Sequence, residues 1–183
     1  GAVPASVVSG MLELAPWVVR LAAAAAAGEA EEQGGAVPQV MAGHSLGEFS
    51  ALVCAGALAF TDAVNLVRQR GAFMQTAVPV GEGAMAAIIG LDDESINRIC
   101  KEVAAAQNRV VAAVNFNSPG QVVIAGHADA VEAAITSLKA AGAKRAMPLP
   151  VSAPFHTALM RPAGEKLADA LATITINAPG IPV

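Results

Sequence analysis

The sequence predicts an α/β protein, because short apolar runs alternate with helical patterns along much of its 183 residues. Hydrophobic residues make up 55% of the chain and charged residues 14%, a composition far from that of disordered proteins. The clearest pattern runs from Gly83 to Leu149, where strand, helix, strand, strand, helix and strand follow one another. That order is typical of a ferredoxin-like unit, so the sequence predicts such a subdomain here.

Before this subdomain the chain predicts helices around one short strand. Residues 10–33 predict a long helix, and the apolar run 37–42 predicts a buried strand. A helix over 48–55 is expected next. Thr61 is then expected to cap a helix that continues to about Met74.

The elements of the subdomain follow from periodicity and from turn residues. Strands are expected at 84–89, 109–115, 121–125 and 144–149, and helices at 93–106 and 128–141. Asp92 is expected to cap the first helix, and Gly142 to end the second. Residues 117–120, Asn-Ser-Pro-Gly, predict a hairpin turn. A further amphipathic helix is expected at about 158–171.

Charge and composition exclude several classes of function. The chain has 11 Lys and Arg against 15 Asp and Glu and no basic run, so a nucleic-acid partner is not expected. Cys54 and Cys100 lack metal-ligand spacing, which favours a reduced, cytoplasmic protein. The apolar stretch 14–27 is too short to cross a membrane and contains Pro16 and Arg20, so no membrane association is expected. We also expect a monomer.

Residues 43–47, Gly-His-Ser-Leu-Gly, match the pattern G-x-S-x-G between a predicted strand and a predicted helix. Such a turn raises the serine hydroxyl at a helix N-terminus, where N–H groups stabilise an oxyanion. Ser45 is therefore a candidate nucleophile, with the N–H of Leu46 as the first oxyanion donor. A surface Gly-Ser loop is the alternative, but it does not explain the flanking elements.

A nucleophilic serine needs a base, and the chain has 3 histidines. His44 adjoins Ser45 and is expected to pack or to form hydrogen bonds beneath the turn. His127, at the entry to a predicted helix, is expected to be a solvated residue near the cap. His156 lies in a proline-held segment before a helix, which favours it as the base, with a structural histidine as the alternative.

Arg70 is a candidate because of its position on a helix. At 100° per residue it shares the apolar face of its helix, whose members are Ala63, Leu66, Val67, Arg70 and Met74. A guanidinium on such a face requires an anionic partner. That partner is either a protein acid such as Glu48 or Asp62, or a carboxylate of the substrate.

Four groups of residues together resemble the malonyl-CoA:acyl carrier protein transacylases and the related acyltransferase domains of fatty acid and polyketide synthases. They are Gly-His-Ser-Leu-Gly-Glu at 43–48, Arg70, Asn-Phe-Asn-Ser-Pro-Gly-Gln at 115–121, and Pro154-Phe155-His156. The resemblance covers residues 34–183.

The resemblance implies an α/β-hydrolase-like core into which a ferredoxin-like subdomain is inserted. The core would comprise residues 1–80 and 149–183, and the subdomain residues 81–148. The family's second oxyanion donor, a glutamine on an N-terminal strand, has no counterpart in these residues. The same holds for the C-terminal carbonyl that orients the family's histidine. We therefore expect a core that is truncated at both ends, as in a piece of a longer protein.

The resemblance also implies residue roles. Ser45 would be the acylated nucleophile and His156 the general base and acid, while Leu46 would donate to the oxyanion. Arg70 would bind the malonyl carboxylate. The further substrate-binding candidates are Asn115, Asn117, Phe155 and Met74. Leu46 and Phe155 also match the malonyl-preferring pattern, in which the phenylalanine crowds an α-methyl branch.

The expected activity is transfer of a malonyl group from coenzyme A to the phosphopantetheine thiol of acyl carrier protein, with malonyl-CoA and the carrier protein as partners. No metal or resident cofactor is expected, because the coenzyme A thioester is a substrate. A serine esterase or thioesterase is the first alternative, and it usually needs an acid between Ser and His. Asp92, Asp93 and Asp129 occur there but resemble caps or surface acids. A non-catalytic fragment that docks carrier protein is the second alternative.

Overall fold

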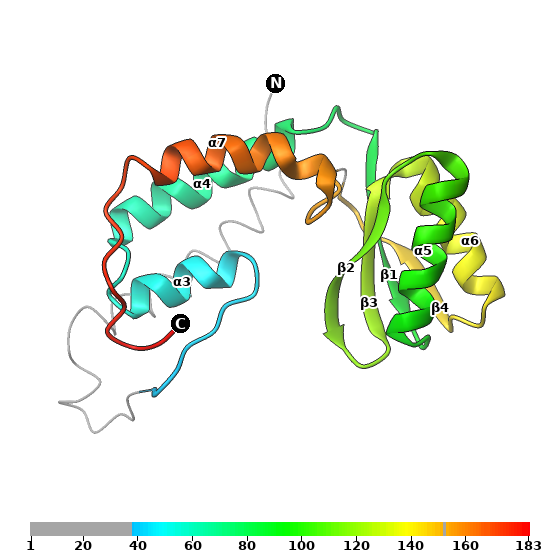
Figure 1. Cartoon of the computed structure of the whole chain (residues 1–183), viewed down its shortest axis with the longest axis horizontal. Helices are drawn as coiled ribbons and strands as arrows, with labels where there is room; N and C mark the ends of the chain where they lie inside the picture. Colours follow the sequence, from blue (N-terminus) through cyan, green and yellow to red (C-terminus); the bar gives the residue numbers. More distant parts are fainter. Residues whose placement is uncertain (1–37, 152) are drawn as a thin grey trace. The chain divides into compact units, whose positions relative to one another are not determined.

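The computed structural model describes residues 38–151 and 153–183, and the helix predicted over 10–33 lies outside this part. The described chain consists of helices and one antiparallel four-stranded sheet (Figure 1). The predicted α/β class is therefore confirmed. No helix among the described residues is long and apolar enough to cross a membrane.

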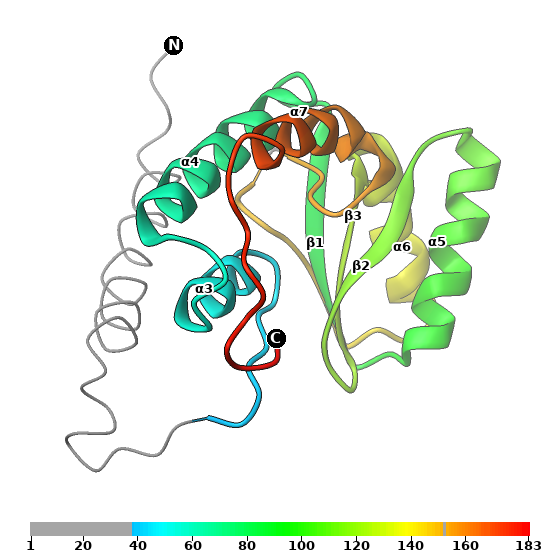
Figure 2. The same ribbon diagram turned by 60° about the vertical axis from the view of Figure 1, so that its left-hand side comes forward.

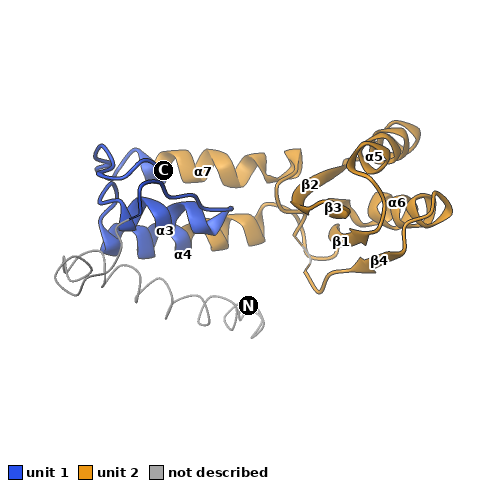
Figure 3. Ribbon diagram, turned by 90° about the horizontal axis from the view of Figure 1, so that it is seen from below, with its two compact units in different colours: residues 1–68, 170–183 blue, residues 69–169 orange. Residues whose placement is uncertain are grey.

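The chain divides into two compact units, which Figure 3 colours separately. The first consists of residues 1–68 and 170–183, and the second of residues 69–169. The divisions fall inside two helices, α4 (Phe60–Thr76) and α7 (Arg161–Leu171).

In the first unit, helix α3 (Leu46–Cys54) begins two residues before its predicted start. The C-terminal tail lies beside α3 in two views (Figures 1 and 2). Its backbone joins the segment that follows α3, since the Gly180 N–H donates to the Ala55 carbonyl at 2.8 Å and Leu58 forms an isolated β-bridge with Ile176. The tail therefore supplies backbone hydrogen-bond partners to residues 55–58, as a neighbouring strand would.

The strand predicted over 37–42 is wrong for the residues that are described. Residues 38–42 have no strand structure, and the backbone hydrogen bond recorded for them joins the Met41 N–H to the Pro182 carbonyl at 2.8 Å. Apolar character alone does not make a strand, because a ladder requires a neighbouring strand with matching hydrogen bonds.

Helix α4 begins at Phe60, so the predicted cap at Thr61 is wrong. The Ala63 N–H already donates to the Ala59 carbonyl at 2.9 Å, which places Thr61 inside the first turn. Ala63 and Leu66 are buried, as expected for the apolar face of this helix.

The second unit contains the whole sheet. Its strands are β1 (Gly83–Ile89), β2 (Val111–Ser118), β3 (Gln121–His127) and β4 (Arg145–Pro148), and its two sheet-covering helices are α5 (Asp93–Gln107) and α6 (Ala128–Ala140). The spatial order is β2-β3-β1-β4, with antiparallel pairs throughout. The predicted order of strands and helices is confirmed.

Capping and turn residues mark where these helices and strands begin and end. The Asp92 carboxylate accepts the Ser95 N–H at 2.8 Å and caps α5, as predicted. Gly142 follows α6 with φ 103°, and the Ala143 N–H donates to the Leu138 carbonyl at 3.0 Å. The hairpin turns at Pro119 and Gly120, as the sequence predicts.

The sheet has two different faces. The face toward α5 and α6 holds the main core, which is built from buried residues of the sheet and both helices: Ala86, Ile88, Ile96, Ile99, Cys100, Val111, Val122, Ile124, Ala130, Val131, Ala134, Leu138 and Ala146. The opposite face carries a smaller cluster of Met85, Val123 and Ala125. Alternate residues of β3 thus contribute to opposite faces, as the two-residue period of a strand requires, and β3 is buried on both faces.

The helix predicted over 158–171 is divided into a 3₁₀ turn, η1 (Ala158–Met160), and α7. Pro162 stands in the first turn of α7, where its missing N–H costs nothing. Both cysteines are free, and burial raises the pKa of Cys100 to about 11.

Candidate active site

Ser45 has an unusual backbone conformation, with φ 55° and ψ −109°. Residues with a side chain rarely adopt a positive φ, and such strain persists where the surroundings impose it. Gly43 is part of the cause. A Cβ at this position would collide with the backbone of Gly47 and Glu48, so the chain passes too close for any other residue. The turn thus has the compact shape that the motif predicts.

Hydrogen bonds fix the Ser45 turn at the start of α3. The Gly47 N–H donates to the His44 carbonyl at 3.0 Å, and the Glu48 N–H donates to the Ser45 carbonyl at 3.3 Å. The Ser45 side chain occupies the N-cap position without making a capping hydrogen bond. Within the described chain, no backbone carbonyl accepts the Leu46 N–H. This N–H is therefore suited to stabilising an oxyanion next to the hydroxyl.

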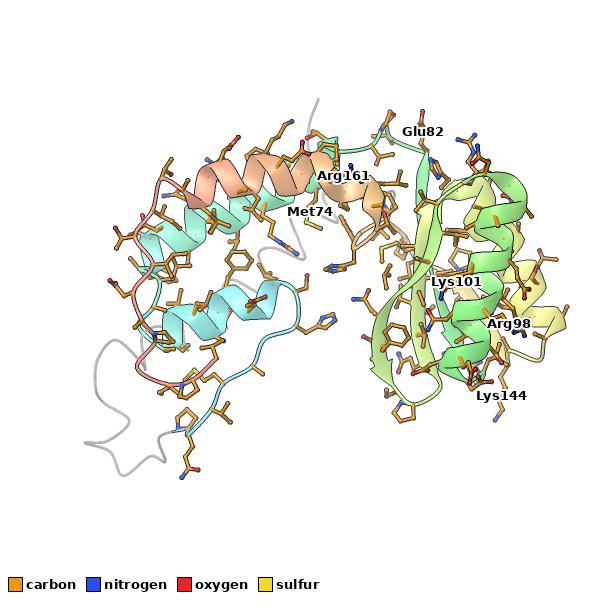
Figure 4. All side chains as sticks on the ribbon, in the orientation of Figure 1. Met74, Glu82, Arg98, Lys101, Lys144 and Arg161 are labelled. Carbon is orange, nitrogen blue, oxygen red and sulfur yellow. The ribbon has the colours of Figure 1, made fainter. Side chains whose placement is uncertain are left out.

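Arg70 lies on the partly buried face of α4, as predicted. Ala63 and Leu66 of this face are buried, whereas Arg70 and Met74 are half-buried. Burial lowers the pKa of the Arg70 guanidinium, because the charged form loses hydration. The group still carries its charge at neutral pH. Met74, one turn later, is labelled in Figure 4.

His156 lies in a short segment that is fixed on both sides. Ala153 and Pro154 before it are buried, and Met160 after it is buried too. His156 has φ 63°, in the left-handed region, and its side chain is exposed. Its backbone conformation therefore also comes from the neighbouring contacts rather than from its own preference.

Thr157 makes the hydrogen bonds around His156. Its hydroxyl donates to the Pro154 carbonyl at 2.7 Å and accepts the Leu159 N–H at 3.3 Å. Thr157 is not among the candidates that the motifs provide. Its signal in the sequence is its place directly before a predicted helix, where threonine is favoured as a cap.

Phe155 and Asn115 belong to the same face of the sheet. Phe155 packs against the cluster of Met85, Val123 and Ala125, on the face opposite α5 and α6. Asn115 is paired with Val123 of that cluster. Both substrate-binding candidates are therefore on the same side of the sheet in the second unit.

A β-bulge turns Asn115 to this face. Val111 and Ala113 of β2 face the main core, so regular alternation would direct Asn115 there too. The register shifts between Ala113 and Asn115, which inserts one residue and reverses the alternation. Asn117, next to a second shift, is exposed.

His127 is half-buried and does not behave as the solvated residue that was expected. It occupies the N-cap position of α6 but makes no capping hydrogen bond. Its Nδ1 accepts the Val110 N–H at 3.0 Å, while the backbone N–H of His127 donates to the Val110 carbonyl at 2.8 Å. The side chain ties two neighbouring segments together, which explains its position without catalysis. His44 is exposed.

Two of the three acids that a hydrolase triad could use, Asp92 and Asp129, have structural contacts. Asp92 caps α5, and Asp129 lies 3.3 Å from Arg109 and accepts the Ala130 N–H at 2.8 Å. No group of three or more metal-ligating side chains occurs among the described residues.

The eight candidate residues are distributed over both units. Ser45 and Leu46 belong to the first unit. The other six belong to the second unit: Arg70, Met74, Asn115, Asn117, Phe155 and His156.

Comparison with known families gives a match over most of the chain. Residues 14–183 match the profile of a family described as "Acyl transferase domain". The malonyl CoA-acyl carrier protein transacylase of Escherichia coli K12 is 67% identical over 153 residues, which are 84% of this chain and 49% of that protein. The protein of the same name from Bacillus subtilis is 53% identical over 152 residues, 83% of this chain and 48% of that one. The chain thus spans about half the length of these curated relatives.

Comparison with solved structures gives proteins of the same kind as the sequence comparison does. An acyl carrier protein S-malonyltransferase from Vibrio cholerae has a TM-score of 0.82 and 58% identity, covering 88% of this chain and 53% of that one. A malonyl-transacylase in complex with its type II polyketide synthase acyl-carrier protein has a TM-score of 0.82 and 59% identity, covering 88% and 52%.

Proposed function

The chain belongs to the acyl transferase domain family, and on this basis we propose that the protein carrying it transfers a malonyl group from coenzyme A to the phosphopantetheine thiol of an acyl carrier protein. The observation that carries the proposal is the strained Ser45 turn at the start of α3. It stands in a chain that is 67% identical to a malonyl CoA-acyl carrier protein transacylase.

The proposed reaction has two half-reactions. His156 takes the proton of the Ser45 hydroxyl, and the serine oxygen attacks the malonyl thioester carbonyl. The Leu46 N–H stabilises the resulting oxyanion. Coenzyme A leaves as the thiol after it receives the proton from His156, and malonyl-Ser45 remains. The carrier-protein thiol then repeats these steps in reverse and releases the serine.

Arg70 gives the proposed site its selectivity. Its guanidinium would bind the free carboxylate of the malonyl group in a bidentate manner, for which the planar fork is suited. An acetyl group has no free carboxylate for the half-buried guanidinium to bind, so it would bind more weakly than a malonyl group. Phe155 and Met74 would supply apolar contacts, and Phe155 would restrict an α-methyl branch. Asn115 and Asn117 would supply polar contacts.

We extend the proposal to the architecture. Residues 1–80 and 149–183 would form part of an α/β-hydrolase-like core, and residues 81–148 an inserted ferredoxin-like subdomain. The strand order β2-β3-β1-β4 with two helices on one face supports the second part. No resident cofactor is required, because coenzyme A enters as the substrate's thioester. The cytoplasm is the proposed location, since the reaction uses this substrate.

Intact-protein mass spectrometry tests the function. The protein that carries this sequence is mixed with malonyl-CoA and, separately, with acetyl-CoA, and the Ser45→Ala variant is the control. We expect a malonyl adduct that is absent from the variant, and a much smaller acetyl adduct. A folded protein that forms no adduct, or whose adduct survives in Ser45→Ala, would contradict the proposal.

A second measurement separates transfer from hydrolysis. The serine esterase or thioesterase alternative is not favoured, because Asp92 and Asp129 have structural contacts and the similar proteins bear the names of transacylases. The proposed enzyme should release little malonate until holo carrier protein is added. Rapid malonate release without carrier protein would support the hydrolase instead.

A further inference from the structure

The backbone at His156 needs a cause beyond its own sequence preference. Its φ of 63° lies in a region that residues with a side chain rarely adopt. Phe155 holds the segment from one side through its contact with Met85, Val123 and Ala125. Met160 and Ala163, both buried, hold it from the other side.

A single side chain connects these two sides across His156. The Thr157 hydroxyl donates to the carbonyl of Pro154, which precedes His156, and it accepts the N–H of Leu159, which follows it. The backbone carbonyl of Thr157 also accepts the Met160 N–H at 3.0 Å. Thr157 therefore links the buried Pro154 to the beginning of η1, and the exposed His156 lies inside this link.

We propose that Thr157 is a positioning residue whose hydroxyl holds the His156 backbone in its left-handed conformation, so that the imidazole points where the general base is needed. The inference rests on the proposed function, since it assigns a supporting residue to the proposed base. Thr157 itself need not touch the substrate.

The hydroxyl, rather than the size of the side chain, carries this role. Without it, the half-buried link loses a donor to the Pro154 carbonyl and an acceptor for the Leu159 N–H. The His156 backbone is then free to relax toward negative φ, which rotates its Cα–Cβ bond. A displacement of about 1 Å at a catalytic group costs roughly 10²-fold in rate.

The test compares Thr157→Ser with Thr157→Ala in the protein that carries this sequence. These two variants differ by one oxygen atom, and Thr157→Val adds a variant of nearly the original shape without the hydroxyl. The matched control is Thr173→Ala, because the Thr173 hydroxyl also donates at 2.7 Å to a carbonyl three residues earlier, that of Ala170. The assay measures kcat and KM for malonyl-CoA, together with the melting temperature.

We expect Thr157→Ala and Thr157→Val to lower kcat by roughly 10- to 100-fold, the range of a displaced catalytic group, with little change in KM. Thr157→Ser should restore most of kcat, and Thr173→Ala should match the wild type. Equal kcat values for Thr157→Ser and Thr157→Ala would overturn the proposal. So would a loss that appears only in KM.

If a variant folds poorly, the action of the base on Ser45 can still be measured directly. The rate at which a fluorophosphonate labels Ser45 is measured per folded molecule, and it does not depend on malonyl binding. We expect the Ala variant to react more slowly than the Ser variant, and equal rates would overturn the inference. Failure of the proposed function looks different: the wild type itself would form no malonyl-Ser45, or His156→Ala would leave transfer unchanged.

Discussion

Ser45 and His156 share a backbone property that their neighbours lack. The described residues other than glycine contain three with positive φ, namely Ser45, Asn108 and His156. Asn108 ends α5 in the left-handed conformation, a common position for asparagine. The other two are the proposed nucleophile and base. Because strain of about 1–3 kcal/mol per residue concentrates at functional sites, its appearance at these two positions strengthens their assignment.

The sequence could single out the candidate residues and the sharp turn at Ser45, whereas it could not predict the backbone conformation of His156. The motif around Ser45 and the position of Arg70 on the apolar face of its helix can be recognised in the sequence, because each depends only on residue types at fixed spacings. The left-handed φ of His156 depends on the burial of Pro154 and on the Thr157 hydrogen bonds, which are tertiary contacts. The same holds for His127, whose bond to the Val110 N–H joins residues far apart in the sequence.

Arg70→Ala tests substrate selection. We expect the kcat/KM for malonyl transfer to fall roughly 30- to 1,000-fold, the equivalent of ~2–4 kcal/mol for a truncated charge pair. Acetyl transfer should fall far less, since acetyl has no carboxylate. Kinetics with the two thioesters measure both values.

Arg70→Lys is the matched control for charge. Lysine keeps the positive charge but lacks the planar fork, so malonyl transfer should lie between the wild type and Arg70→Ala. Equal losses of malonyl and acetyl transfer in Arg70→Ala would mean that Arg70 supports the fold rather than the carboxylate.

Among the elements, those of the second unit lie within two or three residues of their predicted bounds. Strand β1 begins at Gly83 and α5 at Asp93, because caps and turn residues mark these positions locally. The bulge at Asn115 could not be predicted, since it is a property of the pairing with β3 and not of β2 alone. The prediction of a strand over 37–42 was wrong for the same reason, because a run of apolar residues does not determine which neighbouring strand it pairs with.

The Asp92 cap predicts a pH dependence of stability. The hydrogen bond from the Ser95 N–H lowers the pKa of Asp92 below its ordinary 3.8. The ionised cap therefore stabilises the fold at pH values above the pKa that Asp92 has in the unfolded chain. This stabilisation is lost as the pH falls through the pKa of Asp92 in the folded protein. Asp92→Ala should lower the melting temperature at pH 7, and the difference should disappear well below pH ~4.

Asp92→Asn separates the hydrogen bond from the charge. Asparagine caps helices well without ionising. The difference in melting temperature between the Asp92→Asn and Asp92→Ala variants should therefore hardly change with pH. If the difference between the wild type and Asp92→Ala were the same at pH 3 and pH 7, the ionised carboxylate would not be the source of the stabilisation.

Two glycines predict opposite effects on stability. A Cβ at Gly126 of β3 would collide with the backbone of Val110 and Val111, so Gly126→Ala should destabilise the protein by about 1–3 kcal/mol or more. Gly164 lies inside α7, where no described residue comes near the position of a Cβ, and Gly164→Ala should stabilise the protein by ~0.5–1 kcal/mol. Urea unfolding of both variants measures these changes. A destabilised Gly164→Ala would show that a contact limits this position.

For the whole molecule, the described core is unevenly distributed between the two units. The largest fully buried side chains of the second unit include Ile88, Ile96, Ile124 and Leu138, which join both sheet-covering helices to the sheet. In the described part of the first unit, Leu58 and Leu66 are the large buried side chains, and the other buried hydrophobic residues are alanines. Apolar burial scales with area, so the second unit contains more stabilisation of its own than the described part of the first unit does.

This distribution predicts different local stabilities. Backbone amides open with free energies that depend on the packing around them, and core strands open last. Hydrogen exchange followed by mass spectrometry should therefore find the slowest amides in β1 and β3. Residues 38–45 should exchange much faster, because the strained Ser45 turn follows a segment that has no strand ladder. Addition of malonyl-CoA should slow exchange around Ser45 if the serine is acylated, with Ser45→Ala as the control. Exchange at 38–45 as slow as that of β3 would contradict this picture, since it would require hydrogen bonds that a ladder-free segment does not make.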